Sequence, residues 1–348
     1  IGTESLKNLT TGCYNVALGR SSAEKVTTAD YNTALGYLSL KTSTTGAQNT
    51  MVGAFSGDAI TTGQYNVGVG VHAIGSTTDA EGNTGVGYNV LENNTTGDNN
   101  TAIGRNSLDA NTTGADNTAV GKDSLTANTT ANYNTAIGTE ALKAQTTGIS
   151  NVAVGYYSLV LSTTGACNVM VGVQAGHNVS TGLCNTGIGF KAGCNTTTGC
   201  NNASLGHTAI PSSFDADNQI TLGNSDNNNL RCADTSISTL SDLRDKTNVE
   251  DIPHGLDYIL AMRPVKFDWN ARDGSRVGKK DYGFIAQELD QVEQDFDSAE
   301  YTRLVHKDND EAWEADPMKT YPILIKAIQE LSEENKDLKS RIETLESN

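Results

Sequence analysis

A unit of seventeen residues repeats through the first 206 positions and limits what this chain can fold into. An asparagine returns every seventeen residues in twelve copies, and a glycine follows each asparagine four positions later without exception. The asparagines are Asn15, Asn32, Asn49, Asn66, Asn83, Asn100, Asn117, Asn134, Asn151, Asn168, Asn185 and Asn202. The unit is close to TTG-x-x-NTAVG-x-x-SL-x-x-N. A fixed period of this kind predicts a solenoid with one coil per repeat.

The three residues between the asparagine and the glycine predict a short strand. The first is Thr or Val, with one Ala, the second is Ala, Gly, Ser or Met, and the third is Val, Ile or Leu. Side chains alternate along a strand, so we expect the first and third to face inward and the small second residue to face out. The glycine permits the positive φ of a sharp corner. We expect the asparagine to adopt the left-handed conformation and to hydrogen-bond its equivalent one coil away.

Stacked at the strand spacing of about 4.8 Å, twelve coils would form a rod of roughly 55–60 Å. Each coil offers few clearly apolar side chains, so we expect several chains to pack side by side and bury the small-residue face. The rod is either a spacer or a receptor-binding surface, and the pattern favours neither. Paired threonines suggest ice binding, but they precede the glycine of a turn and do not alternate on a strand. Asp and Glu fall at scattered positions of the repeat, which disfavours the paired carboxylates of a glycan hydrolase.

Charge and composition separate two regions and exclude some partners. The 35 glycines and 5 prolines suit a thin repetitive structure, and the net charge of −17 disfavours nucleic acid. Residues 1–240 carry 9 basic and 16 acidic side chains, whereas 241–348 carry 15 and 25, so the second region is more densely charged. No apolar run reaches the roughly 18–20 residues of a membrane span, so no membrane insertion is expected. The chain starts at Ile1 within a repeat, and we expect it to be part of a longer protein.

All six cysteines precede position 241, and their spacings match no zinc-binding pattern. They are Cys13, Cys167, Cys184, Cys194, Cys200 and Cys232. Cys167 and Cys184 stand one repeat apart and are expected to be neighbours in adjacent coils. We expect small thiols, with a disulfide or a metal site as the alternatives, and no cofactor.

The phrases NTAVG-x-x-SL and NTAIG-x-x-AL, at residues 117–125 and 134–142, resemble the β-roll head repeats of trimeric autotransporter adhesins and of many phage fibres. The resemblance covers about residues 10–206, although the unit of that family is usually shorter than seventeen. It implies a left-handed trimeric β-roll.

Residues 207–240 contain short β-branched runs broken by Asn, Asp and Gly, which predict a few last strands before a change of domain.

Ser241 and Lys246 follow this connector and could act together. A serine hydroxyl needs a base, and lysine serves as one when burial or a cation such as Arg244 lowers its pKa. A spacing of five does not share a helix face, so a turn or an extended stretch must bring the two together. The pattern alone is weak, and Ser241 capping a helix beside a solvated Lys246 is the simpler interpretation.

The wider segment favours the dyad over the helix cap. It contains four blocks, which read SDLRDKTNVEDI, GLDYILAMRPVKFDW, DYGFIAQEL and YPILIKAIQEL. Together they resemble the intramolecular chaperone domain of endosialidase tailspikes and related phage fibres, across nearly all of 241–348. The resemblance implies a homotrimer that is cut once between Leu240 and Ser241. It makes Ser241 the nucleophile and Lys246 the general base, with Asp242 and Arg244 as candidates for support. Two departures, a missing Val-Pro or Phe-Pro after the AQE block and an acidic loop over 297–316, do not touch this pair.

The last stretch, from about Tyr321, predicts a helix with an unbroken heptad seam. The seam residues after Tyr321 are Leu324, Ile328, Leu331, Asn335, Leu338, Ile342 and Leu345. A coiled coil between subunits is favoured over a core helix. The seam does not decide between two and three strands, and three comes from the family resemblance.

Upstream of this helix, Val265, Phe267 and Trp269 predict a strand filling the domain core, with a hairpin turn at 272–275 leading to a GFIA strand.

These observations predict a mainly β, trimeric 17-residue β-roll or β-solenoid over 1–206, a β connector over 207–240, and an α+β chaperone auto-protease over 241–348. The expected protein is the precursor of a phage tail fibre or tailspike, assembled in the host cytoplasm and located in the virion. It would cleave itself once, release the chaperone and bind a host surface receptor or glycan. The alternatives are a non-cleaving trimeric cell-surface adhesin and a receptor-degrading enzyme.

Overall fold

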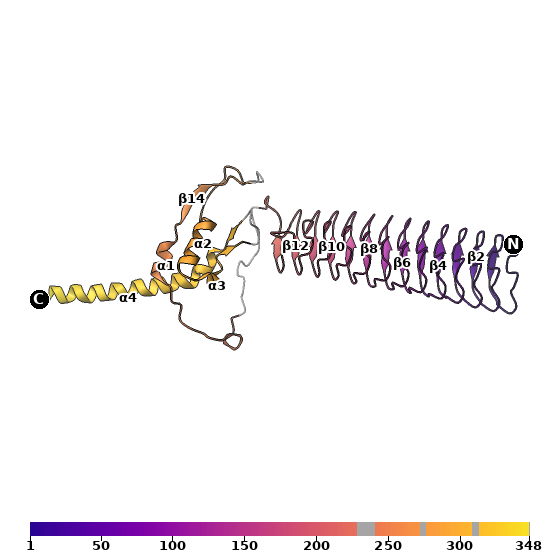
Figure 1. Cartoon of the computed structure of the whole chain (residues 1–348), viewed down its shortest axis with the longest axis horizontal. Coiled ribbons are helices and arrows are strands. Elements are labelled where there is room, and N and C mark those ends of the chain that lie inside the picture. The colour runs from indigo at the N-terminus through magenta and orange to yellow at the C-terminus, as the bar shows by residue number, and fades with distance from the viewer. Residues whose placement is uncertain (228–240, 272–275, 308–312, 348) are drawn as a thin grey trace. The chain divides into compact units, whose positions relative to one another are not determined.

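The computed structural model describes residues 1–227, 241–271, 276–307 and 313–347. The chain divides into two compact units, Ile1–Asn224 and Ser225–Asn348. The first is a stack of coils that each contribute one short strand, and Figure 1 shows these strands side by side along the stack. The strands are β1 (Val16–Leu18), β2 (Thr33–Leu35), β3 (Thr50–Val52), β4 (Val67–Val69), β5 (Thr84–Val86), β6 (Thr101–Ile103), β7 (Thr118–Val120), β8 (Thr135–Ile137), β9 (Val152–Val154), β10 (Val169–Val171), β11 (Thr186–Ile188), β12 (Ala203–Leu205) and β13 (Ile220–Leu222).

The strands form one parallel sheet in sequence order, so the predicted β-solenoid is confirmed. Each residue pairs with its equivalent seventeen positions on, as Thr118 does with Thr135 and Val120 with Ile137. β13 lies beyond residue 206 and pairs with β12 in the same register. The stack therefore continues for one strand into the segment predicted as a connector.

The predicted direction of the strand side chains is wrong. In β7 the small middle residue Ala119 is fully buried, whereas the flanking Thr118 and Val120 lie partly exposed on the outer face. The same pattern holds in the other strands of the stack up to β12. The reason is volume, because a fully buried leucine such as Leu125, eight residues after the asparagine, already fills the narrow coil. Only a small residue fits opposite it.

Two methionines fill interior space in coils that lack the buried leucine. Met51 and Met170 occupy the inward strand position and are buried. A Cβ added to Gly57 would lie 2.6 Å from the Met51 sulfur, and one added to Gly176 would lie 2.8 Å from Cγ of Met170. Both glycines stand where most other coils carry leucine, so each methionine fills the space that the missing leucine leaves.

The repeated asparagine forms a ladder of buried hydrogen bonds. The side-chain oxygen of Asn117 accepts from the backbone N–H of Asn134 at 3.0 Å, and its Nδ2 donates to the Ala131 carbonyl at 2.8 Å. The predicted contact between equivalent asparagines is thus confirmed. The left-handed residue, however, is the one before the asparagine, as at Tyr133 with φ 63°. The ladder runs to Asn202, whose oxygen accepts from the N–H of Gln219 at 3.0 Å.

Gln219 occupies the asparagine position in the coil that carries β13, and its side chain bonds to its own coil. Its Oε1 accepts from the backbone N–H of Ser212 at 2.9 Å, and its Nε2 donates to the Ser212 hydroxyl at 2.7 Å. The longer glutamine side chain therefore turns back, where each asparagine from Asn15 to Asn202 reaches forward to the following coil.

We expect Asn117→Ala to lower the free energy of unfolding of the rod by about 2–5 kcal/mol, because it leaves a buried N–H and a buried carbonyl without their partner. The matched control is Thr113→Ala, whose side chain is exposed on the same coil, with an expected change within about 0.5 kcal/mol. Thermal unfolding followed by circular dichroism measures both. Equal midpoints for the two variants would contradict a stabilising role for the ladder.

The second unit is a small α+β domain built from short elements. Its elements are the 3-10 turn η1 (Leu243–Asp245), α1 (Leu256–Ala261), β14 (Val265–Asp268), β15 (Lys280–Gly283), α2 (Ala286–Asp295), α3 (Ala299–Thr302), β16 (Val305–His306), β17 (Glu314–Ala315), the 3-10 turn η2 (Pro317–Thr320) and α4 (Tyr321–Glu346). β14 pairs with β15 and β16 pairs with β17, both antiparallel. α1 packs against α4.

The core of this domain lies between its helices and not on the β14 strand. The buried cluster consists of Tyr258, Met262, Leu289, Val292, Leu304 and Ile323. Val265 and Phe267 are only partly buried, so the prediction that they fill the core is wrong. The strand after the hairpin is Lys280–Gly283, and Ala286 of the GFIA block begins helix α2 instead. The hairpin turn predicted at 272–275 lies outside the described residues.

A buried carboxylate connects α2 to the segment that follows it. Glu293 is 3% exposed, and its Oε1 accepts from the Thr302 hydroxyl and from the Leu304 backbone N–H, each at 2.6 Å.

Across residues 1–227, 241–271, 276–307 and 313–347, no helix is long and apolar enough to cross a bilayer.

Candidate functional site

A short 3-10 turn brings Ser241 and Lys246 together. Asp242 caps this turn by accepting a hydrogen bond from the Arg244 backbone N–H at 2.9 Å, and the Lys246 N–H closes it on the Leu243 carbonyl. The chain is extended again at Lys246. As a result, Lys246 Nζ lies 2.7 Å from Ser241 Oγ and donates a hydrogen bond to it. The expectation that a turn, and not a helix face, must join the pair agrees with this geometry.

Arg244 and Asp242 pair with each other beside this contact. The Arg244 guanidinium bonds to both carboxylate oxygens of Asp242, at 3.0 Å through Nε and 2.6 Å through its terminal nitrogen. The bonds from Arg244 hold the pKa of the Asp242 carboxyl below its ordinary value and raise the pKa of Arg244. Arg244, the cation expected from the sequence to lower the pKa of Lys246, is therefore paired with the Asp242 carboxylate.

The whole segment from Ser241 to Glu250 is exposed in the single chain. A serine and a lysine in contact with water form a hydrogen bond, but a lysine becomes a strong general base when its charge is desolvated. Leu240, the residue on the other side of the proposed cut, lies outside the described residues. The geometry thus places the Lys246 amine in contact with the Ser241 hydroxyl, in a segment that the unit itself leaves uncovered.

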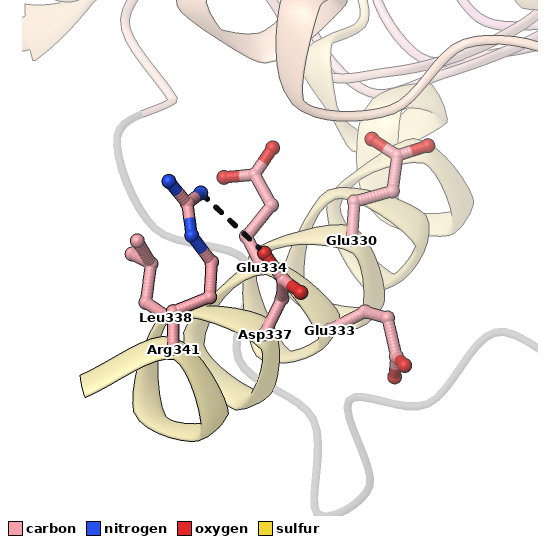
Figure 2. A pocket seen from close by; sticks show the side chains of 6 residues that line it. All are labelled: Glu330, Glu333, Glu334, Asp337, Leu338 and Arg341. Carbon is pink, nitrogen blue, oxygen red and sulfur yellow. Dashed lines mark ion pairs between the residues drawn. The ribbon is translucent and has the colours of Figure 1, made fainter. Parts of the chain in front are cut away.

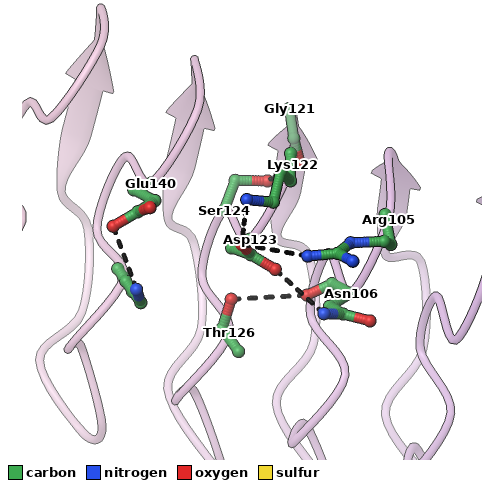
Figure 3. Close-up of polar contacts among 9 residues, drawn as sticks. Arg105, Asn106, Gly121, Lys122, Asp123, Ser124, Thr126 and Glu140 are labelled. Carbon is green, nitrogen blue, oxygen red and sulfur yellow. Dashed lines mark hydrogen bonds and ion pairs between the residues drawn. The ribbon is translucent and has the colours of Figure 1, made fainter.

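Charged side chains on the rod form ion pairs and hydrogen bonds with one another. Asp123 is largely buried and accepts from the side-chain amide of Asn106 at 2.9 Å, as Figure 3 shows. Lys122 and Arg105 approach the same carboxylate at 3.2 and 3.9 Å. In the next coil Glu140 pairs with Lys143 at 2.9 Å. Asp123 thus joins its coil to the preceding one through Asn106 and Arg105, whereas the Glu140–Lys143 pair lies within a single coil.

Among the described cysteines, Cys13, Cys167, Cys184, Cys194 and Cys200 are free thiols, and Cys232 lies outside the described residues. In that same part of the chain, no group of three or more His, Cys, Asp or Glu side chains could hold a metal ion.

Helix α4 presents two different faces. Ile323 and Ala327 are each 4% exposed and belong to the side packed on the domain. On that side Glu330 accepts a hydrogen bond from the Leu256 backbone N–H at 2.7 Å. The predicted seam residues are not buried, and Ile328 is 63% exposed. The seam of α4 is thus an apolar stripe that the single chain does not cover.

Charged side chains flank this stripe. Figure 2 shows an open hollow along α4 lined by Glu330, Glu333, Glu334, Asp337, Leu338 and Arg341. Arg341 pairs with Asp337 one turn away at 3.7 Å, and Lys336 pairs with Glu333 at 3.2 Å. Charges beside an apolar seam are typical of the positions that flank the contact in a coiled coil.

Comparison with known proteins identifies the region that holds the Ser241–Lys246 pair. Residues 241–299 match the family model described as chaperone of endosialidase, a family of self-cleaving peptidase domains. The match starts at Ser241 and ends before the block at α4. No curated protein and no solved structure matches the chain. The chain therefore holds a segment, residues 241–299, that matches the chaperone-of-endosialidase family, and a parallel β-solenoid precedes it.

Proposed function

We propose that this chain is the precursor of a trimeric phage tail fibre or tailspike that cuts its own backbone once, between Leu240 and Ser241. The observation that carries the proposal is the 2.7 Å contact between Lys246 Nζ and Ser241 Oγ. It occurs at the first residues of a region that matches a self-cleaving family. The β-solenoid before it is the fibre, and the domain after it is the chaperone.

The reaction begins when deprotonated Lys246 takes the proton from the Ser241 hydroxyl. The Ser241 oxygen then attacks the Leu240 carbonyl, the Leu240–Ser241 amide bond breaks, and an ester to Ser241 forms. The freed α-amino group of Ser241 takes up a proton. Water hydrolyses the ester and leaves a carboxylate at Leu240 and the restored hydroxyl at Ser241. Because the substrate is the chain itself, each molecule reacts once.

Exposure of the pair explains how cleavage would wait for assembly. Ser241 and Lys246 are both exposed in the single chain. Packing of three chains would desolvate Lys246 and favour its neutral form. Assembly would take place in the host cytoplasm, and the finished rod would reach the virion without its chaperone. A host receptor or glycan as the target of the rod stays a prediction from the family resemblance.

The simplest test is the mass of the purified chain. We expect fragments 1–240 and 241–348 in place of the full-length chain, with the larger fragment in a trimer. An oligomer that stays at full length would overturn the cleavage proposal and favour the non-cleaving adhesin. Cleavage at a bond other than Leu240–Ser241 would overturn the site assignment alone.

The exposed seam of α4 supports association of the chaperone through a coiled coil. We expect Ile342→Lys, at a seam position, to reduce oligomer formation at least about ten-fold, because it places a charge in each chain's share of the apolar contact. Ser340→Lys adds the same charge on the opposite side of the helix and is the control. Light scattering of full-length chains carrying Ser241→Ala measures both. Equal oligomer fractions in the two variants would show that α4 is not the contact.

A further inference from the structure

The outer face of the rod's sheet is free of charge along its whole length. This face consists of the first and third residues of every strand, which the structure turns outward. Within residues 1–224, all of them described, none of these positions carries Asp, Glu, Lys, Arg or His. The first positions hold Thr, Val, Ala or Ile, and the third hold Val, Ile or Leu. We call this surface the strand face.

Charges do occur at other outward positions of the coil. Five residues after the asparagine some coils carry Arg105 or Lys122 while others carry aromatic or aliphatic residues, and nine residues after it stand Asp58, Glu92 and Lys143. The chain as a whole carries a net charge of −17. The third positions of the strand face form an uninterrupted row of Val, Ile and Leu, whereas the first positions mix Thr with Val, Ala and Ile. A sheet face that meets water is normally polar, and a long apolar row is usually covered by a partner.

The strand face is also incompletely buried in the single chain. Its third-position residues Ile137 and Ile188 are 41% and 47% exposed, and Leu222 in β13 is 54% exposed. Two rows of mostly β-branched residues, with leucine at some third positions, repeat at the spacing of the coils and form a regular ridged surface. Such a surface fits a partner that has the same repeat and the same length.

We infer that the strand face is the surface through which copies of this rod pack against each other, in parallel and around a common axis. The partner is a second copy of this chain, because only a rod with the same rise matches the ridges along all thirteen strands. A shared α4 coiled coil would set the copies parallel. This inference rests on the proposed trimer and places the contact on the strand face, opposite to the small-residue side expected from the sequence alone.

Disulfide trapping tests the location of the contact. The chain is prepared with its six cysteines replaced by serine, with Ser241→Ala to keep it intact, and with a single new cysteine. Ile137→Cys lies on the strand face, and Thr130→Cys, exposed on another face of the rod, is the matched control. Copper phenanthroline with dissolved oxygen is the oxidant, and denaturing gel electrophoresis measures covalent dimers. We expect at least ten-fold more dimer from Ile137→Cys.

The outcomes separate this inference from the proposed function. An oligomer by light scattering that is cross-linked through Thr130→Cys, or through neither cysteine, would overturn the strand-face contact and leave the trimeric fibre standing. A monomer by light scattering would overturn both. As a second readout, Ile137→Lys should lower the thermal unfolding midpoint of the oligomer far more than Thr130→Lys, whereas equal midpoints would also contradict the inference.

Discussion

Replacing Ser241 with alanine is expected to leave the chain at full length, with cleavage slowed by roughly 10³-fold or more, because the attacking oxygen is lost. Lys246→Ala should have an effect of similar size, since it removes the amine that contacts the Ser241 hydroxyl. The double variant should be no slower than either single variant, because the two groups act as one unit. Mass spectrometry of the purified protein over time measures the cleaved fraction.

Lys279→Ala is the control, because Lys279 is an exposed lysine of the same unit outside the 241–246 turn. It should be cut like the wild type. Circular dichroism and light scattering on every variant would separate a lost reaction from lost assembly. If Ser241→Ala were cut at the wild-type rate, the pair would not be the catalyst, even though processing itself would be real.

Gly121→Ala is expected to disrupt the rod and to destabilise it by more than about 4 kcal/mol. Gly121 has φ 138°, a conformation that an alanine rarely adopts. A Cβ at this position would also lie 2.5 Å from the Gly138 carbonyl oxygen in the next coil. Because that oxygen belongs to the backbone, the stack cannot relieve the overlap by moving a side chain. The soluble yield and the thermal unfolding midpoint report the effect.

Gly75→Ala serves as the control within the same rod. The nearest atom to a Cβ there is the Glu92 carbonyl oxygen at 3.7 Å, which is ordinary contact. Most other coils carry a side chain at this position, so we expect a change within about 1 kcal/mol, stabilising if it limits the unfolded chain. Comparable losses in the two variants would mean that the corner glycine is not the constraint described here.

The solenoid was predictable because its period is visible in residues that cannot be exchanged freely, above all the asparagine and the corner glycine. The direction of the strand was not, because alternation assigns two faces without saying which is inside. Leu125 held the missing signal, since one large apolar residue per coil fills the interior and leaves room only for Ala119. The left-handed backbone at Leu108 and Tyr133 has no sequence signal, because neither residue favours it.

For the site, the sequence predicted that a turn would join Ser241 to Lys246 but missed the pairing of Arg244 with Asp242. A signal existed, because an aspartate that caps a short turn lies two residues before an arginine able to fold back on it. The catalytic assignment could not come from these six residues at all. It depends on the family match over 241–299. The burial of Glu293 in the same domain could not be predicted either, because no sequence pattern marks its bond to the Leu304 backbone N–H.

The turned-back side chain of Gln219 has a consequence for the end of the described stack. The end of a parallel stack is an open template that can recruit further strands, and uncontrolled growth there leads to aggregation. Two hydrogen bonds between the Gln219 amide and Ser212 close the coil that carries β13 onto itself. That coil is therefore held in shape by its own side chain as well as by the bond from the Gln219 backbone N–H to Asn202.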